Sequence, residues 1–259
     1  MKLNKLTASL IAASAMAFAS GAQAITVAGV TWDPNSILDF TSQTNLYETI
    51  GVNVGDTFSG YGQITAVNGI GAFCNNCELT YEFGGYTITK AAAVGDLSFT
   101  ADGGWLKVYV QNTGAVGFTA FDFMDKSSAT DGDVWLDLVA SSAYFDSLGT
   151  FLPGTTIVGS VTIPNDAGTS GQGGGYFDVV GGLAADYLDT NGEPGGADLT
   201  YTSSFQPIGG NIVNDGEVVA THVGTNEVKG TSVPEPATLA LLGLGLVGLG
   251  LARRSKKVA

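Results

Sequence analysis

The chain has 259 residues, 38 of them glycine, and a formal net charge of −14 at pH 7. The acidity lies in residues 25–232, which hold 23 of the 24 Asp and Glu side chains, only four of the ten Lys and Arg side chains, and so a net charge of −19. So negative a segment repels nucleic acid and anionic membrane surfaces, which argues against both as partners. It suits cations, neutral sugars or basic partners.

The first 24 residues are typical of a secretory signal peptide. Lys2 and Lys5 precede a mostly apolar run, 6–18, and Ala22-Gln23-Ala24 matches the small-x-small pattern of a cleavage site. The apolar run is shorter than the roughly 20 residues that a bilayer-spanning helix needs. We therefore expect cleavage after Ala24 and export of residues 25–232 as one domain.

Residues 25–232 predict short antiparallel strands rather than helices. Apolar and polar residues alternate in 78–83, 105–111 and 133–138, and turn-forming clusters that contain Asp, Asn and Gly separate such segments. The sequence thus predicts an all-β antiparallel domain that resembles a sandwich or a jelly roll. The other candidate strands, in chain order, are 25–31, 58–67, 86–89, 97–101, 118–123, 156–163, 176–180, 199–205 and 217–222.

Further local expectations follow from the same patterns. The Gly/Ser-rich stretch 166–175 is expected to be a mobile loop, because its composition resists ordering, and 228–232 is expected to be a linker. The alternation places Trp105 and Trp135 on outer faces of their strands. There they would either bind sugars or lie under a second covered layer.

Cys74 and Cys77 are the only cysteines, in the sequence Cys-Asn-Asn-Cys. A redox site of this spacing normally opens a helix, whereas a strand-like segment follows here. A closed zinc site needs four ligands, and His222 is the only histidine. Because an exported chain meets an oxidising environment, we expect a local disulfide that fixes one turn.

The sequence has two acidic clusters, 122–137 and 186–198, and the second is the candidate metal site. Carboxylate and amide oxygens at alternate positions are ligands of the kind that calcium prefers, but the spacing departs from that of an EF-hand loop. Solvated loop acids explain the same residues. The candidate calcium ligands are Asp186, Asp189, Asn191, Glu193 and Asp198, and the sequence suggests no other cofactor.

No residue stands out as catalytic. His222 lies in no nucleophile motif. Paired carboxylates could serve a glycoside hydrolase, but a sequence does not show which acids face each other across a cleft. We therefore expect a protein that is not an enzyme.

The C-terminal residues 233–259 have three parts in a fixed order. The triplet Pro234, Glu235 and Pro236 comes first, the apolar run 237–252 follows, and Arg253 and Arg254 open a basic end. As a helix the run would be about 24 Å long, close to the span of a bilayer core. The basic end would hold the C-terminus in the cytoplasm, so we expect a single membrane helix with the main domain outside.

This tail resembles the PEP-CTERM sorting signal of Gram-negative bacteria. The resemblance implies that exosortase, a membrane-embedded cysteine protease, recognises Pro234, Glu235 and Pro236 and processes the tail, with Arg253 and Arg254 as part of the signal. It further implies transient anchoring in the inner membrane by the C-terminal helix. The protein would then reach the cell surface or the extracellular matrix.

The exported domain also resembles the flocculation-associated PEP-CTERM proteins. The segments that carry this likeness are ITVAGVTWDPNSILDFTSQTNLYET (25–49), GYGQITAVNG (60–69) and FCNNCELTYEFGGYT (73–87). The resemblance implies a surface or matrix protein that promotes flocculation or biofilm cohesion together with exopolysaccharide. The alternative is an exported domain that binds or hydrolyses glycans.

The two ends generate a testable prediction. Protein released into the medium should begin at Ile25 and should lack the apolar tail, because signal peptidase and exosortase act at opposite ends of the chain. Intact-mass spectrometry of secreted material measures both ends. Secreted protein that still contains residues 239–257 would contradict the processing step.

Overall fold

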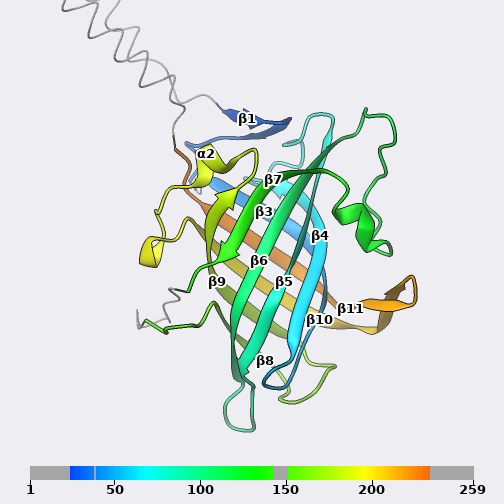
Figure 1. Cartoon of the computed structure of the whole chain (residues 1–259), viewed down its shortest axis with the longest axis vertical. Helices are drawn as coiled ribbons and strands as arrows, with labels where there is room; N and C mark the ends of the chain where they lie inside the picture. The colour runs from blue at the N-terminus through cyan, green and yellow to red at the C-terminus, as the bar shows by residue number, and fades with distance from the viewer. Residues whose placement is uncertain (1–23, 38, 143–150, 234–259) are drawn as a thin grey trace, which may run out of the picture.

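The computed structural model describes residues 24–37, 39–142 and 151–233, which are mostly β-strands (Figure 1). The rest of the predicted signal peptide, the apolar tail and the sorting residues Pro234, Glu235, Pro236, Arg253 and Arg254 lie outside the described residues. Across the described ranges, no helix has the length and apolar character needed to cross a membrane. The strands are β1 (Ile25–Val27), β2 (Val30–Trp32), β3 (Phe40–Thr49), β4 (Thr57–Val67), β5 (Cys77–Lys90), β6 (Ser98–Asn112), β7 (Asp133–Ala140), β8 (Ile157–Val161), β9 (Gly171–Gly181), β10 (Leu199–Asn214) and β11 (Glu217–Gly230), and the short helical turns are η1 (Lys126–Ala129), α2 (Ala185–Leu188) and η2 (Pro194–Gly196).

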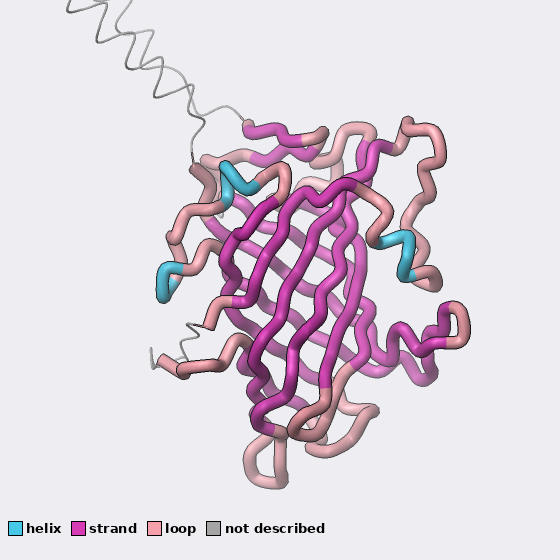
Figure 2. The backbone as a smooth tube through the Cα atoms, in the orientation of Figure 1, coloured by secondary structure: helices cyan, strands magenta, loops and turns pink. Residues whose placement is uncertain are grey.

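Strands β3 to β11 form one antiparallel sheet that closes on itself. Neighbouring strands follow the order β10-β11-β3-β4-β5-β6-β7-β9-β8, and β9 also pairs with β10, from Leu199↔Phe177 to Phe205↔Gly171. Strand β8 pairs with β9 and with the first residues of β6. Figures 1 and 2 show two walls of the closed sheet crossing over a shared interior. The predicted all-β antiparallel class is confirmed, with the two facing walls in the place of a sandwich's two layers.

The core lies between the walls, on the inward face of each strand. The three alternating segments of the sequence all contribute to it: Leu79 and Tyr81 from β5, Leu106 from β6, and Leu136 and Leu138 from β7 are each at most 2% exposed. Complete burial of a leucine side chain contributes roughly 1.5–3 kcal/mol. The alternation that predicts these strands therefore also identifies the side chains that hold the walls together.

The hairpin of β1 and β2 covers one end of the interior with aromatic rings. Trp32 is 2% exposed and packs edge-on against Phe40 at 5.8 Å, Trp135 at 5.9 Å and Tyr187 at 6.0 Å between ring centroids. The Trp135 Nε1–H donates to the carbonyl oxygen of Val27 at 3.1 Å, which ties the hairpin to the sheet. We call Trp32, Phe40, Trp135 and Tyr187 the aromatic cap.

The expectation that Trp135 lies on an outer face is wrong. Strands β6 and β7 pair Val108 with Leu136 and then Tyr109 with Val134, so Trp135 is the extra residue of a bulge. The bulge turns its ring inward, where it is fully buried. Trp105 does lie outward and is partly exposed, with its indole against Gly84 and Gly85 of β5.

Several segment boundaries differ from the expectation. Strand β3 is not predicted, because polar residues occupy both of its faces. The glycine-rich residues 171–175 are not a mobile loop but the first half of β9, paired with both β8 and β10. Residues 228–230 end β11 rather than begin a linker, and 118–123 form a connection without a named strand. The candidates 78–83 and 86–89 join into β5, and 97–101 and 105–111 join into β6, whereas 25–31 divides into the hairpin of β1 and β2.

The predicted disulfide between Cys74 and Cys77 is confirmed, with 5.2 Å between the two Cα atoms. It closes the turn that leads into β5. Cys74 also bridges Val30, and the Asn75 N–H donates to the Gly29 carbonyl at 3.1 Å. The disulfide closes the turn, and these two backbone contacts hold the turn against the β1–β2 hairpin.

Gly104 provides a test of how tightly the interior is packed. Its φ is +105°, and an added Cβ would lie 2.1 Å from the ring of Tyr86. Gly55 has a similar φ of +91° with nothing within 4 Å. Gly104→Ala should lower the free energy of unfolding by roughly 2–4 kcal/mol, from left-handed strain plus overpacking, and Gly55→Ala by roughly 1–2 kcal/mol from strain alone. Urea unfolding measures both; equal losses would show that Tyr86 yields freely.

Candidate functional site

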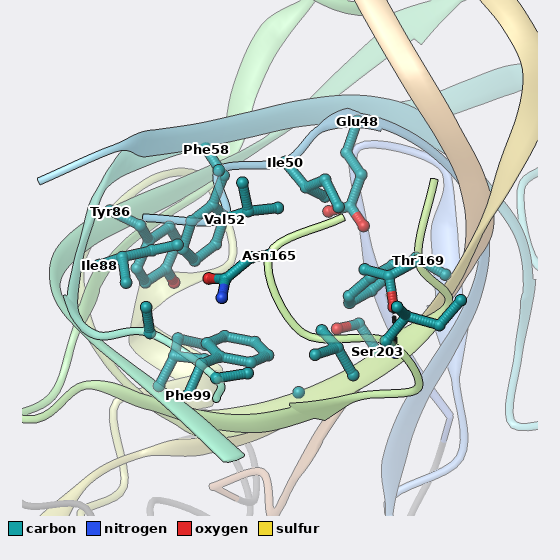
Figure 3. Close-up of a pocket in the computed structure, with 18 of the residues that line it drawn as sticks. Glu48, Ile50, Val52, Phe58, Tyr86, Ile88, Phe99, Asn165, Thr169 and Ser203 are labelled. Carbon is teal, nitrogen blue, oxygen red and sulfur yellow. Dashed lines mark hydrogen bonds between the residues drawn. The ribbon is translucent and has the colours of Figure 1, made fainter. Parts of the chain in front are cut away.

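A cavity lies inside the closed sheet, at the end opposite the aromatic cap (Figure 3). The cavity has a volume of about 50 Å³, which is room for roughly three to five water-sized groups. Strands β4, β5, β6, β8 and β10 and the connections at 50–52 and 163–169 supply most of its walls. Its lining is mainly apolar, with Ile50, Val52, Phe58, Ile88, Phe99 and Ile157 among the contributing side chains.

Glu48 is the only carboxyl group among the residues that line this cavity. It occupies the last inward position of β3, two residues after Leu46, and is 4% exposed. Its Oε1 has no hydrogen-bond partner. Desolvation by burial raises the pKa of Glu48 to about 8, because the charged form loses its hydration. At neutral pH the cavity therefore holds mostly a protonated carboxyl group.

His222 stands beside Glu48 in the sheet and holds the segment that covers the cavity. The two residues are register partners across β3 and β11, so their side chains share the inner face. The His222 Nε2 lies 3.0 Å from the carbonyl oxygen of Thr169, and Nδ1 lies 2.8 Å from the hydroxyl of Thr221. Because a carbonyl only accepts, Nε2 carries the proton. Burial lowers the pKa of His222, so the neutral ring serves as a positioning group.

A polar row continues inward from Glu48 along the same two strands. Thr44 Oγ1 donates to Asn226 Oδ1 at 2.7 Å, and Ser42 Oγ donates to the Val228 carbonyl at 3.2 Å. These side chains line a second hollow of about 10 Å³, close to the minimum for one water molecule. The interior thus combines an apolar cavity with a polar strip on β3 and β11.

A third, open hollow lies on the outside of the sheet, over β3, β10 and β11, with a volume of about 560 Å³. We call it the outer groove. None of its lining residues is charged, and the polar ones include Asn45, Ser204, Gln206 and Thr225. Tyr47 adds an aromatic ring, which stacks on Phe123 at 5.5 Å and on Tyr61 at 5.8 Å.

The candidate calcium ligands lie near α2 and η2, and two of them already have other partners. The buried Asp198 carboxylate accepts the backbone N–H groups of Val179 and Thr190 at 2.7 Å and of Asn191 at 2.6 Å. Thr200 Oγ1 donates to Glu193 Oε2 at 2.8 Å. In the part of the chain that the structure describes, no group of three or more His, Cys, Asp or Glu gathers to hold a metal. Calcium binding by Asp186, Asp189, Asn191, Glu193 and Asp198 stays a prediction.

The sequence alone does not single out Glu48. It lies in FTSQTNLYET, where the inward residues after Phe40 are Ser42, Thr44, Leu46 and Glu48. This inward row mixes polar with apolar side chains, so the strand lacks the usual alternation. The available signal is a lone acid in a stretch that otherwise carries no charge.

The raised pKa of Glu48 predicts a pH-dependent stability. Between its usual value of 4.5 and about 8, the folded state binds more protons than the unfolded state. The free energy of unfolding should therefore fall as pH rises from about 5 to about 9. Glu48→Gln cannot ionise, so the wild type should lose more stability than this variant over that range, by on the order of a few kcal/mol.

Urea unfolding at several pH values checks this difference, with the exposed Glu217→Gln as the matched control. The lowered pKa of His222 acts with the opposite sign, because stability from that group rises with pH. His222 is present in every protein compared, so the difference between the curves reports the ionisation of Glu48 together with its coupling to His222. Parallel stability curves for wild type and Glu48→Gln would contradict the prediction.

Residues 232–256 match the PEP-CTERM protein-sorting motif, whereas no curated protein and no solved structure matches the chain. Ser232 and Val233 are the only residues of the motif that the structure describes. Ser232 Oγ donates to Asp39 Oδ1 at 2.7 Å, and the Val233 N–H donates to the Tyr187 carbonyl at 2.8 Å, so the motif begins beside the aromatic cap. The chain therefore carries a PEP-CTERM sorting motif at residues 232–256, and the motif implies an exported protein that exosortase sorts.

Proposed function

We propose that this exported protein promotes flocculation or biofilm cohesion together with exopolysaccharide, and that the outer groove is its contact surface. One observation carries the proposal: in a strongly acidic exported domain, this groove is lined by amide, hydroxyl, aromatic and aliphatic groups without a charged side chain. The proposed route is transient anchoring in the inner membrane of a Gram-negative bacterium by the C-terminal helix. Exosortase processing then delivers the domain to the cell surface or matrix.

The chemistry of the groove suits sugar hydroxyl groups. A hydroxyl both donates and accepts hydrogen bonds, and the side-chain amides of Asn45 and Gln206 offer both functions. An aromatic ring presents a flat apolar face, which fits the C–H face of a sugar ring. The rings of Phe123 and Tyr61 hold the Tyr47 ring in place, since it stacks on both of them.

The charge of the domain limits the kind of polymer that it contacts directly. A net charge of −19 over residues 25–232 repels an acidic polysaccharide unless cations screen or bridge the two. Neutral sugars meet no such barrier at the uncharged groove. We therefore propose contact with neutral sugar units, supplemented by divalent cations where the polymer is acidic.

The residues that line the outer groove and the inner cavity support binding rather than hydrolysis. Glycoside hydrolases place two carboxyl groups on either side of the scissile bond, roughly 5–9.5 Å apart. The residues that line the outer groove include no carboxyl group, and those that line the inner cavity include only Glu48. We propose a protein that binds glycan without hydrolysing it.

Deletion of the gene tests the proposed function when aggregates and secreted polymer are assayed separately. The deletion strain should disperse while polymer secretion continues, and the wild-type gene should restore aggregation. Tyr47→Ser should restore it poorly, because it removes the ring from the outer groove. Tyr109→Ser removes another partly buried, outward-facing tyrosine, on β6, and should restore aggregation fully.

Two outcomes contradict the proposal. Normal flocculation of the deletion strain would remove the role in cohesion, and loss of polymer secretion would replace it with a role in synthesis or export. Chelation of divalent cations separates the two contact modes. An acidic polymer should lose cohesion on chelation, whereas a neutral-sugar contact should respond much less.

A further inference from the structure

The inner cavity combines a mainly apolar lining with one buried polar atom that has no partner, Glu48 Oε1. Glu48 points into the space between Phe58, Tyr86 and Phe99 on one side and Thr169 and Ser203 on the other (Figure 3). Its Oε1 is buried without a hydrogen bond. An unpaired buried polar atom lowers stability, and a replacement by an apolar side chain of similar shape would avoid that cost. The position of this atom is therefore evidence for a ligand that forms the missing hydrogen bond.

We propose that the cavity binds a small neutral molecule with an apolar body and a single carbonyl oxygen, which accepts a hydrogen bond from the Glu48 carboxyl group. The proposal goes beyond cohesion and does not involve the outer groove. Different side chains line the inner cavity and the outer groove, apart from Phe205, which contributes to both. Failure of one proposal therefore leaves the other standing.

The surroundings of Glu48 favour a neutral ligand. None of the residues that line the cavity is a lysine or an arginine. The titratable groups that face Glu48 are His222 on β11, Tyr81 and Tyr86 on β5, and Tyr201 on β10, and burial lowers the pKa of His222 and raises the pKa of each tyrosine. All four are therefore neutral at neutral pH. A protonated carboxyl group in such surroundings has one O–H to donate, and a carbonyl oxygen is its complement.

The size of the cavity sets the size of the ligand. Space for roughly three to five water-sized groups suits a molecule such as butan-2-one. The aromatic and aliphatic walls bury its alkyl groups, and the removal of these groups from water favours binding. The ligand therefore gains from the walls and from Glu48 at the same time.

Butan-2-one is the probe, and its binding to the exported domain is measured by NMR titration at pH 6 and pH 9.5. The wild type should bind at pH 6 and lose most of its affinity at pH 9.5, where Glu48 is ionised and donates no hydrogen bond. Glu48→Gln retains an N–H donor and should bind equally at both pH values. Glu48→Leu should bind about tenfold more weakly than the wild type at pH 6, the loss expected for one hydrogen bond. Glu217→Gln should behave as the wild type.

Titration of the Glu48 carboxyl carbon in the wild type needs no variant to fold. Bound butan-2-one stabilises the protonated form and should raise the pKa of Glu48 further. Absence of binding at pH 6, or equal binding by wild type and Glu48→Leu, would overturn the proposal. Butylamine provides the contrasting probe: tighter binding of this cation, with a lowered pKa of Glu48, would overturn the neutral ligand in favour of an ammonium site.

Discussion

The pairing of β9 with β10 is the contact on which the rest of the structure depends. Strand β10 is the first strand in the sheet order, and β9 lies near the other end of that order. Their pairing, from Leu199↔Phe177 to Phe205↔Gly171, closes the sheet. An open sheet would leave two edges unpaired and its inner face in water. Gly171 permits the contact, because an added Cβ would lie 2.4 Å from the ring of Phe205. Closure is therefore what encloses the cavity and removes Glu48 from water.

Asp198 and Glu48 are both buried, but their carboxyl groups differ in their hydrogen-bond partners. Asp198 accepts three backbone N–H groups and organises the connection between β9 and β10. Glu48 is buried at the other end of the interior and keeps one oxygen without a partner. An acid with hydrogen-bond partners stabilises the fold, whereas a buried acid without them lowers stability. The aromatic cap and the start of the sorting motif lie at the end of the interior away from Glu48 and the inner cavity.

Much of the fold follows from alternation in the sequence. Strands β5, β6 and β7 carry apolar residues at every second position, and the same side chains, such as Leu106 and Leu138, form the core. Alternation does not predict strand β3, because Ser42, Thr44 and Glu48 face inward with Leu46. Composition predicts a flexible segment for the glycines of β9. In the structure, hydrogen bonds to strands on both sides hold these glycines extended.

The sequence by itself determined what is encoded by neighbouring residues: the sorting motif, the acidic exported segment, the all-β class and the Cys74–Cys77 disulfide. Each depends on composition or on spacings of a few residues. Only the tertiary structure decided which acid is buried, because Glu48 loses its water through strands that lie far from it in the chain. It likewise decided that Trp135 turns inward, since the bulge arises from register with β6. Both outcomes depend on pairing between distant segments, and the residues next to Glu48 and Trp135 in the sequence do not specify that pairing.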